Sequence, residues 1–175
     1  LAKKSADIQI NDLKKIKAVF DKSFVQAVDL ILNCKGKVVF AWVGKSGLIA
    51  RKISATFSSI GIPSFFCHPS DALHGDLGQI EKKDILIIFS YSGNTSELTN
   101  MLKYANRFKI KIIGIASKAE SVLLKASDIK LKLPKVKEAD LISMVPTSST
   151  TISLLLGDCL ATTIMSQKRF SKDTF

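Results

Sequence analysis

Short apolar runs alternate with helical patterns along the chain, and this alternation most constrains its fold. Runs with the length and composition of buried strands lie at 38–43, 64–67, 85–89, 112–116 and 129–133. Between and after them, apolar residues recur at helical spacing, at 48–60, 98–105, 121–126 and from Pro146 to about residue 167. This order predicts a three-layer α/β fold with a mostly parallel sheet. Right-handed crossovers would place the carboxyl ends of the strands at one edge, where ligands bind.

The segment before the first strand has its own helical pattern. Apolar residues recur at helical spacing over residues 7–33, which exceeds one average helix. Asp7 or Asn11 is suited to cap the start. A long amphipathic leading helix often covers a neighbour, so we expect an oligomer contact there. The length suits one domain, 1–175, with an α/β core at about 38–170.

The net charge of +11 raises the question of nucleic-acid binding. The basic residues are 23 lysines and only three arginines, scattered from end to end. Phosphate clamping and base readout favour clustered arginines, so we expect no nucleic-acid partner. The densest basic stretch, 130–137, alternates lysines with apolar residues and predicts an edge strand with a solvated lysine face. A positive field would instead attract an anionic metabolite.

Cysteine usage indicates a reduced, cytoplasmic protein. Cys34, Cys67 and Cys159 are widely spaced in apolar surroundings, and no CxxC pair is present. No apolar run approaches the roughly 20 residues needed to span a bilayer, so we expect no membrane partner. The first residue is Leu, which indicates a trimmed or partial version of a longer chain.

The turn after the third apolar run is the clearest candidate site. It has the sequence Ser90-Tyr91-Ser92-Gly93-Asn94-Thr95-Ser96-Glu97 and precedes a helical pattern. Hydroxyl donors, a permissive Gly93 and the free N–H groups of a helix start together favour a phosphate site. The alternative is an ordinary helix cap, but a cap needs only one hydroxyl.

A second glycine turn, Gly44-Lys45-Ser46-Gly47, follows the first apolar run. A nucleotide-binding P-loop requires glycine where Val39 stands, and the run 85–89 ends in Ser90 rather than an acidic residue. We therefore reject an ATPase. What remains is a second helix start, whose residues meet those of the serine-rich turn at one sheet edge.

Both histidines lie in the polar stretch 68–78. Their six-residue separation is not a usual metal-ligand spacing, so we expect no metal. His68, before Pro69, is expected to be a turn residue. His74 lies in a loop with Gly75 and Asp76, where a titratable imidazole suits acid/base chemistry or hydroxyl binding. A surface histidine is the alternative.

These motifs, in this order, resemble the sugar isomerase (SIS) domain over roughly 38–170. The matching stretches are Gly44-Lys45-Ser46-Gly47, Phe65-Phe66-Cys67-His68-Pro69, Ala72-Leu73-His74-Gly75-Asp76-Leu77-Gly78, the serine-rich turn, Lys137-Glu138-Ala139 and Pro146-Thr147-Ser148-Ser149-Thr150-Thr151. The His-Gly-Asp-Leu-Gly loop and the last stretch resemble the D-arabinose 5-phosphate isomerase branch.

The resemblance implies a flavodoxin-like, five-stranded, mainly parallel sheet and a homotetramer that needs no cofactor. The implied reaction interconverts D-ribulose 5-phosphate and D-arabinose 5-phosphate for Kdo synthesis. The implied phosphate-binding residues are Ser46, Ser90, Ser92 and Thr95. Those implied to act on the sugar are Lys45, His74, Glu97 and Glu138, and further substrate contacts are Gly75, Thr147 and Ser148.

Aldose–ketose interchange through an enediol needs a base at carbon, a polarising group and a proton shuttle. We expect Glu97 or Glu138 as the base, with a pKa raised in a closed pocket. Lys45 is expected to stabilise charge and His74 to open the ring or shuttle the proton. Three alternatives stay open. Glu97 suits a capping box with Asn94, Glu138 suits a plain surface charge, and Lys45 suits a solvated turn.

The chain also departs from the family pattern. Typical members continue beyond the equivalent of Arg169-Phe170 into a His-Pro-Gly-Gly segment and often a pair of CBS modules, whereas this chain stops at Phe175. Two other functions share the serine-rich turn. One is isomerisation of another sugar phosphate, as in 6-phospho-3-hexuloisomerase, and the other is non-catalytic sugar-phosphate sensing.

Overall fold

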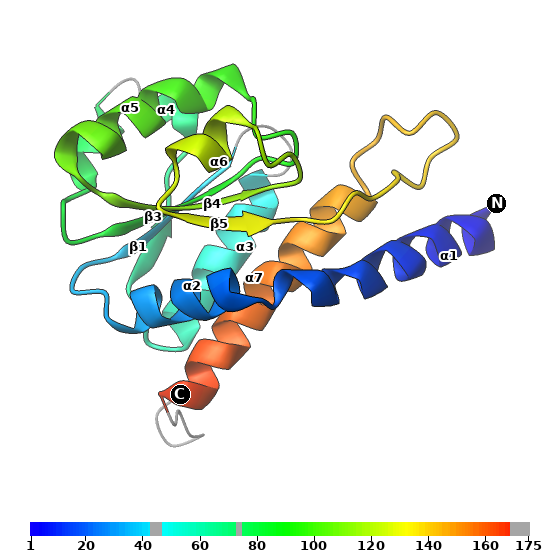
Figure 1. Cartoon of the computed structure of the whole chain (residues 1–175), viewed down its shortest axis with the longest axis horizontal. Helices are drawn as coiled ribbons and strands as arrows, with labels where there is room; N and C mark the ends of the chain where they lie inside the picture. The colour runs from blue at the N-terminus through cyan, green and yellow to red at the C-terminus, as the bar shows by residue number, and fades with distance from the viewer. Residues whose placement is uncertain (43–46, 73–74, 169–175) are drawn as a thin grey trace.

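The computed structural model describes residues 1–42, 47–72 and 75–168, which form an α/β fold around one five-stranded sheet (Figure 1). The strand order is β2-β1-β3-β4-β5, and every neighbouring pair is parallel. The strands are β1 Val38–Ala41, β2 Ser64–Phe66, β3 Ile85–Phe89, β4 Lys111–Ala116 and β5 Ile129–Lys132. The predicted parallel sheet is confirmed, and the order is that of flavodoxin-like folds.

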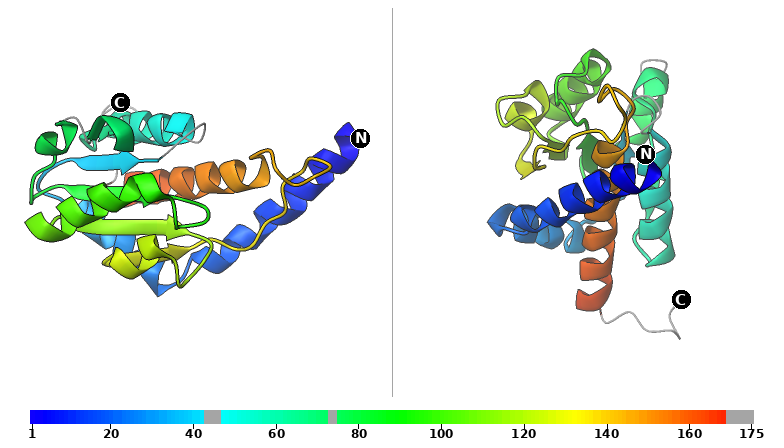
Figure 2. Two further views of the ribbon diagram at one scale, coloured as in Figure 1. Left: turned by 90° about the horizontal axis from the view of Figure 1, so that it is seen from above. Right: turned by 90° about the vertical axis from the view of Figure 1, so that its right-hand side faces the viewer.

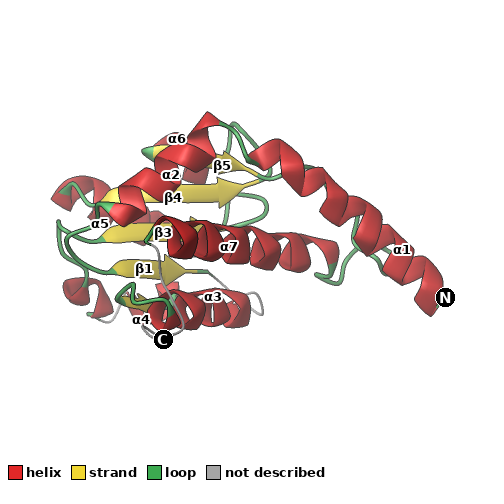
Figure 3. Cartoon of the chain, turned by 90° about the horizontal axis from the view of Figure 1, so that it is seen from below, coloured by secondary structure: helices red, strands yellow, loops and turns green. Residues whose placement is uncertain are grey.

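Helices cover both faces of the sheet, which confirms the three layers (Figures 1 and 3). One face carries α2 Lys22–Leu32, α3 Gly47–Ser59 and α7 Ser148–Gln167. The other carries α4 Pro69–Ala72, α5 Thr99–Phe108 and α6 Val122–Ala126. Shorter 3₁₀ turns lie at Lys14–Val19, Asp76–Gln79 and Ser96–Leu98.

Alternate residues of each strand enter the two hydrophobic cores, because successive side chains point to opposite faces. Ile87 packs with the α2–α3–α7 side, whereas its neighbours Leu86 and Ile88 pack with the α5–α6 side. Since both faces are covered, the strands are continuous apolar runs rather than alternating ones. Burying one such side chain contributes about 1.5–3 kcal/mol.

The leading segment differs from the predicted single helix over 7–33. It consists of α1 Ala2–Leu13, the 3₁₀ turn Lys14–Val19 and α2. The helical conformation is interrupted at Asp21, whose backbone is extended. Its carboxylate accepts hydrogen bonds from Ser23 N (2.8 Å) and Phe24 N (3.3 Å). A short acidic side chain at this position starts a new helix. Asp7 and Asn11 therefore lie inside α1 and do not cap it.

Helix α1 contacts α7 and extends beyond the sheet, so that the amino terminus lies far from the sheet and its covering helices (Figure 2).

Helices α7 and α3 pack closely at Gly157 and Ile53. A glycine is needed there, since a Cβ at position 157 would collide with the Ile53 side chain. The prediction of an edge strand with a lysine face is confirmed for Lys130 and Lys132, which are exposed on the terminal strand β5, but it was wrong for 134–137, because β5 ends at Lys132. Among the described helices, none is both long and apolar enough to cross a membrane.

Candidate functional site

The serine-rich turn lies where it was predicted, between β3 and the 3₁₀ turn Ser96–Leu98. The order β2-β1-β3 makes the carboxyl ends of β1 and β3 the switch point of the sheet, where ligands bind in such folds. The buried Ser90 continues the ladder, donating its N–H to Ile115 O (3.0 Å). Its Oγ accepts from Gly93 N (3.0 Å) and lies 2.8 Å from Thr95 Oγ1. The turn is therefore closed around the Ser90 hydroxyl.

Gly93 allows the turn to pack on the start of α6. Its φ of 71° is left-handed, and an added Cβ would meet the Ser121 side chain. The neighbouring Asn94 Oδ1 accepts from Val122 N (3.0 Å), and Gly93 O accepts from Leu123 N (3.0 Å). Asn94 thus supports α6 and forms no capping box with Glu97, so that alternative was wrong.

Polar groups of the turn remain available to an anion. Ser92 is exposed, and its Oγ accepts a long hydrogen bond from Asn94 N (3.3 Å) and makes no other with the described residues. The backbone N–H groups of Ser92 and Thr95 have no hydrogen-bond partner among the described residues. Backbone donors and hydroxyls that converge at a strand–helix turn suit a phosphate group.

Glu97 is exposed on the 3₁₀ turn after this stretch. Its own backbone N–H and the Ser96 hydroxyl, whose Oγ lies 2.8 Å from Oε2, hold its pKa below the ordinary value. The expectation of a raised pKa was therefore wrong for Glu97, because its carboxylate is exposed among the described residues and these hydrogen bonds favour its charged form. At neutral pH the group is ionised and able to accept a proton.

Glu138 sits at the amino end of α7. Its Oε2 accepts hydrogen bonds from Thr147 N (2.7 Å), Thr147 Oγ1 (2.9 Å) and Ser149 N (3.3 Å). Burial raises the pKa of this carboxyl, but the bonds from Ser149 and Thr147 outweigh it, and the pKa lies below its ordinary value. The alternative of a plain surface charge was wrong, since a carboxylate here neutralises a helix start. The raised pKa expected of a base was wrong here too.

The two predicted substrate contacts on this helix differ in what they already bind. Thr147 Oγ1 also accepts from Ala139 N (2.8 Å), so its hydroxyl closes the loop before α7. The Ser148 hydroxyl is fully buried and has no hydrogen-bond partner among the described residues. Such a group at a helix amino end is a candidate ligand contact.

The remaining predicted residues are partly outside the described ranges. Lys45, Ser46 and His74 belong to residues 43–46 and 73–74, so their predicted roles stay predictions. Gly75 is described, with φ 119°, just before the 3₁₀ turn Asp76–Gln79. His68 accepts from Ser70 N (3.2 Å) at Nδ1, as a turn residue does. Over 1–42, 47–72 and 75–168, no group of three or more metal-ligating side chains is found.

Tyr91 is the residue of this region to which the sequence assigned no role. It is a large aromatic residue among small hydroxyl side chains, and its own hydroxyl accepts from Val136 N (2.7 Å). It thereby joins the serine-rich turn to the segment that leads to Glu138. The composition of the turn was the only signal, because the bond spans 45 residues.

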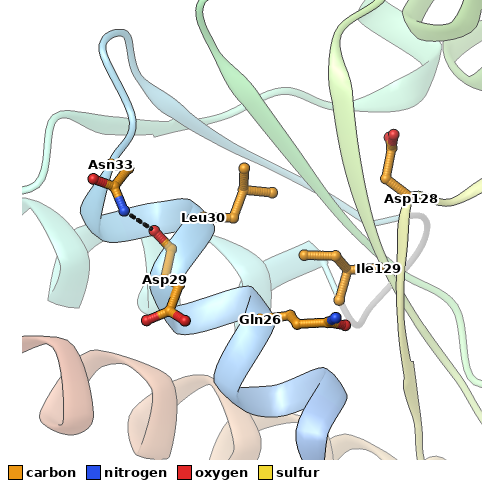
Figure 4. Close-up of a pocket in the computed structure, with 6 residues that line it drawn as sticks. All are labelled: Gln26, Asp29, Leu30, Asn33, Asp128 and Ile129. Carbon is orange, nitrogen blue, oxygen red and sulfur yellow. Dashed lines mark hydrogen bonds between the residues drawn. The ribbon is translucent and has the colours of Figure 1, made fainter.

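A separate hollow lies on the α2 side of β5 (Figure 4). It has a volume of about 460 Å³ and is lined by Gln26, Asp29, Leu30, Asn33, Asp128 and Ile129. Asp128 and Ile129 precede or begin β5, so the hollow lies at the amino end of the strands. The serine-rich turn lies at their carboxyl ends, and the hollow is no part of the predicted site.

The sequence of this chain is similar to that of a known protein family and of its curated members. The model of the SIS domain matches residues 31–163. Arabinose 5-phosphate isomerase KdsD of Francisella tularensis (strain SCHU S4) is 42% identical over 171 residues, which are 96% of this chain and 52% of that protein. The chain spans about half the length of the curated relatives it matches.

Two solved structures match most of both chains. A protein of Listeria monocytogenes (strain 4b F2365) superposes with a TM-score of 0.92 at 33% identity, covering 97% of this chain and 89% of that one. A protein of Escherichia coli CFT073 in complex with arabinose 5-phosphate gives a TM-score of 0.88 at 37% identity, covering 95% and 90%. The fold and the order of its elements are therefore shared with these proteins.

Proposed function

Because this chain belongs to the SIS domain family, we propose that it is the isomerase domain of an enzyme that interconverts D-ribulose 5-phosphate and D-arabinose 5-phosphate. The observation that carries the proposal is the Ser90–Thr95 turn at the switch point of the sheet, with open donors for a phosphate. The similarity to KdsD and to a protein with arabinose 5-phosphate bound supports the choice of sugar phosphate. The pathway that uses the product is proposed to be Kdo synthesis.

The phosphate is proposed to bind the hydroxyls of Ser46, Ser90, Ser92 and Thr95. Ser90 and Thr95 already share a hydrogen bond, so their oxygens are preorganised. The phosphate does not react; it fixes the position of C1 and C2 of the sugar. Gly75, Thr147 and Ser148 are proposed to contact the sugar itself, and the unpaired buried Ser148 hydroxyl supports this role.

For the chemistry, we assign proton abstraction at carbon to Glu97 and a hydroxyl contact to Glu138. Glu97 is ionised, exposed and one turn beyond the phosphate hydroxyls. The hydrogen bonds from Thr147 N, Thr147 Oγ1 and Ser149 N all fall on Oε2 of Glu138, and Oε1 is proposed to accept from a sugar hydroxyl. Lys45 is proposed to stabilise the enediolate charge and His74 to open the ring or shuttle a proton.

The test is a conversion assay with the natural full-length polypeptide and a panel of sugar phosphates. D-Arabinose 5-phosphate is expected to yield ketopentose, and Glu97→Gln is expected to remove most turnover while leaving the fold intact. Conversion of a different sugar phosphate would replace the proposed substrate. Binding across the panel without conversion would instead indicate a sensor.

We also propose that the protein is cytoplasmic and forms a homotetramer, with neither nucleic acid nor membrane as a partner. An apolar surface supports assembly: Leu141 and Met144 are 85% and 73% exposed on the loop before α7. Together with the start of α1, this loop encloses a hollow of about 650 Å³. Sedimentation equilibrium of the full-length polypeptide tests this assembly, and a monomer at micromolar concentration would refute it.

A further inference from the structure

Residues 134–138 form a strap that leaves the sheet and ends at Glu138. The last ladder bond before it runs from Leu133 N to Ala116 O (2.8 Å). Pro134 then ends the pairing, because it has no N–H to donate. Among the described residues, the backbone of 134–138 makes no further backbone–backbone hydrogen bond. Side chains from two distant parts of the chain hold it instead.

Tyr91 holds the strap from the serine-rich turn. Its hydroxyl accepts from Val136 N (2.7 Å) and faces Pro134 O (3.3 Å) and Val136 O (3.5 Å), one of which receives its proton. The turn end of this connection is fixed as well. The Tyr91 carbonyl accepts from both the N–H (2.9 Å) and the hydroxyl (2.7 Å) of Ser117, at the end of β4.

Helix α1 and the 3₁₀ turn that follows it hold the strap from the other side. The buried Asp12 accepts from Lys137 N (2.8 Å) at Oδ2, and Lys15 Nζ donates to Lys135 O (3.3 Å). Pro134 and Val136 thus bind Tyr91, whereas Lys135 and Lys137 bind the leading segment, as expected of an extended strap whose successive groups alternate.

The next residue, Glu138, is fixed at the amino end of α7. The serine-rich turn is therefore connected to this carboxylate through the hydrogen bonds of the Tyr91 hydroxyl to the strap and through the strap backbone that leads to Glu138. We propose that Tyr91 is a positioning residue that sets the distance between the phosphate-binding hydroxyls and Glu138. This inference rests on the proposed function.

The physical reason lies in what the reaction needs. A bound phosphate fixes one end of the sugar, so a group that acts at the other end works only at the right distance from the turn. Misplacement by about 1 Å costs as much as 100-fold in rate. The turn itself is held by separate bonds to Ser117, Val122 and Leu123. Loss of the Tyr91 hydroxyl should therefore move the strap and leave the phosphate contacts in place.

The test is Tyr91→Phe in the natural full-length polypeptide, assayed with D-arabinose 5-phosphate. Phenylalanine keeps the ring, which packs against the α2–α3–α7 core, and removes only the hydroxyl. We expect kcat to fall roughly tenfold, with KM within about twofold of the parent. The matched control is Tyr104→Phe, since the Tyr104 hydroxyl donates to Ile80 O (3.4 Å) on the opposite face of the sheet. Its kcat should match the parent.

A double-mutant cycle separates positioning from a general loss of stability. In a Glu138→Gln background, the effect of Tyr91→Phe on kcat should largely vanish, because the positioned carboxylate is already gone. An unchanged kcat in Tyr91→Phe, a rise in KM alone, or a full tenfold effect in the Glu138→Gln background would each overturn the proposal.

Amide hydrogen exchange keeps this proposal separate from the proposed function. Tyr91→Phe should speed exchange at Lys137 and Thr147, because the strap and the start of α7 loosen, while Leu123 stays as in the parent. A parent that converts no sugar phosphate refutes the isomerase. If the parent is inactive, the exchange data still decide the role of Tyr91. Exchange at Thr147 that is the same in Tyr91→Phe and the parent would overturn that role, whereas faster exchange in Tyr91→Phe would support a role of Tyr91 in positioning Glu138.

Discussion

Replacing Gly93 with alanine tests whether the phosphate turn depends on the shape of its backbone. Two costs arise in the structure. The φ of 71° is left-handed, which costs a residue with a Cβ about 1–2 kcal/mol. The new Cβ also meets the buried Ser121 side chain and lies 3.0 Å from Ala116 Cβ.

The clash cannot be relieved by a simple rotation. Ser121 is 1% exposed, and its Oγ accepts from Leu124 N at the start of α6, so neither the side chain nor the helix is free to move. Overpacking of this kind costs about 1–3 kcal/mol. Together with the backbone cost, Gly93→Ala should destabilise the domain by about 2–5 kcal/mol.

Urea unfolding followed by Trp42 fluorescence measures this change. Trp42 is the one tryptophan of the chain, and its ring stacks on Phe89 (centroids 5.0 Å apart) just before the turn. Gly78→Ala is the matched control, because a Cβ there meets no described atom within 4 Å. A loss below about 0.5 kcal/mol in Gly93→Ala, or an equal loss in Gly78→Ala, would refute the reasoning.

Three further predictions concern other parts of the chain. Asp21→Ala should cost about 1 kcal/mol in urea unfolding, because α2 loses its cap, whereas Asp7→Ala should change stability little. Burial, with Asp76 and Asp71 nearby, raises the pKa of the Cys67 thiol to about 11, so at pH 8 Cys67 should react last of the three cysteines with a thiol reagent. The pKa of Glu138 is lowered in the folded state, so its stabilising bonds are fully present above its ordinary pKa of 4.5 and are lost as pH falls through the lower folded value. The stability of Glu138→Gln should therefore fall less steeply than that of the parent below pH 4.5, and parallel curves would contradict the assignment.

The sheet was predictable because its strands are buried on both faces. A continuous apolar run as short as 85–89 is typical of a strand buried on both faces, since helices are usually longer. The helical segments between the runs indicate crossover connections, which make neighbouring strands parallel. The break at Asp21 was missed because apolar residues keep helical spacing on both sides of it. The Asp21 carboxylate accepts from Ser23 N and Phe24 N and so starts a new helix there, which the spacing of apolar residues does not reveal.

The site was predictable where its residues are contiguous. The turn 90–97 carries its hydroxyls in sequence, so its place after β3 followed from the pattern alone. The environment of Glu138 could not be predicted from the sequence pattern, because the groups that bind it, Thr147 and Ser149, come from the start of another element. The low pKa of Glu97 was missed for a related reason: it depends on a hydrogen bond from the backbone N–H of Glu97 and on the Ser96 rotamer, neither of which a sequence specifies.

The most direct test of the account is the steady-state conversion of D-arabinose 5-phosphate by the full-length polypeptide and its Ser92→Ala variant. Ser92 is exposed and makes one long bond within the turn, so its loss should leave the fold intact. A hydrogen bond to a charged group is worth about 1.5–3 kcal/mol, so KM should rise roughly 10- to 150-fold with kcat nearly unchanged. Absence of conversion by the parent, or an unchanged KM in the variant, would contradict the account.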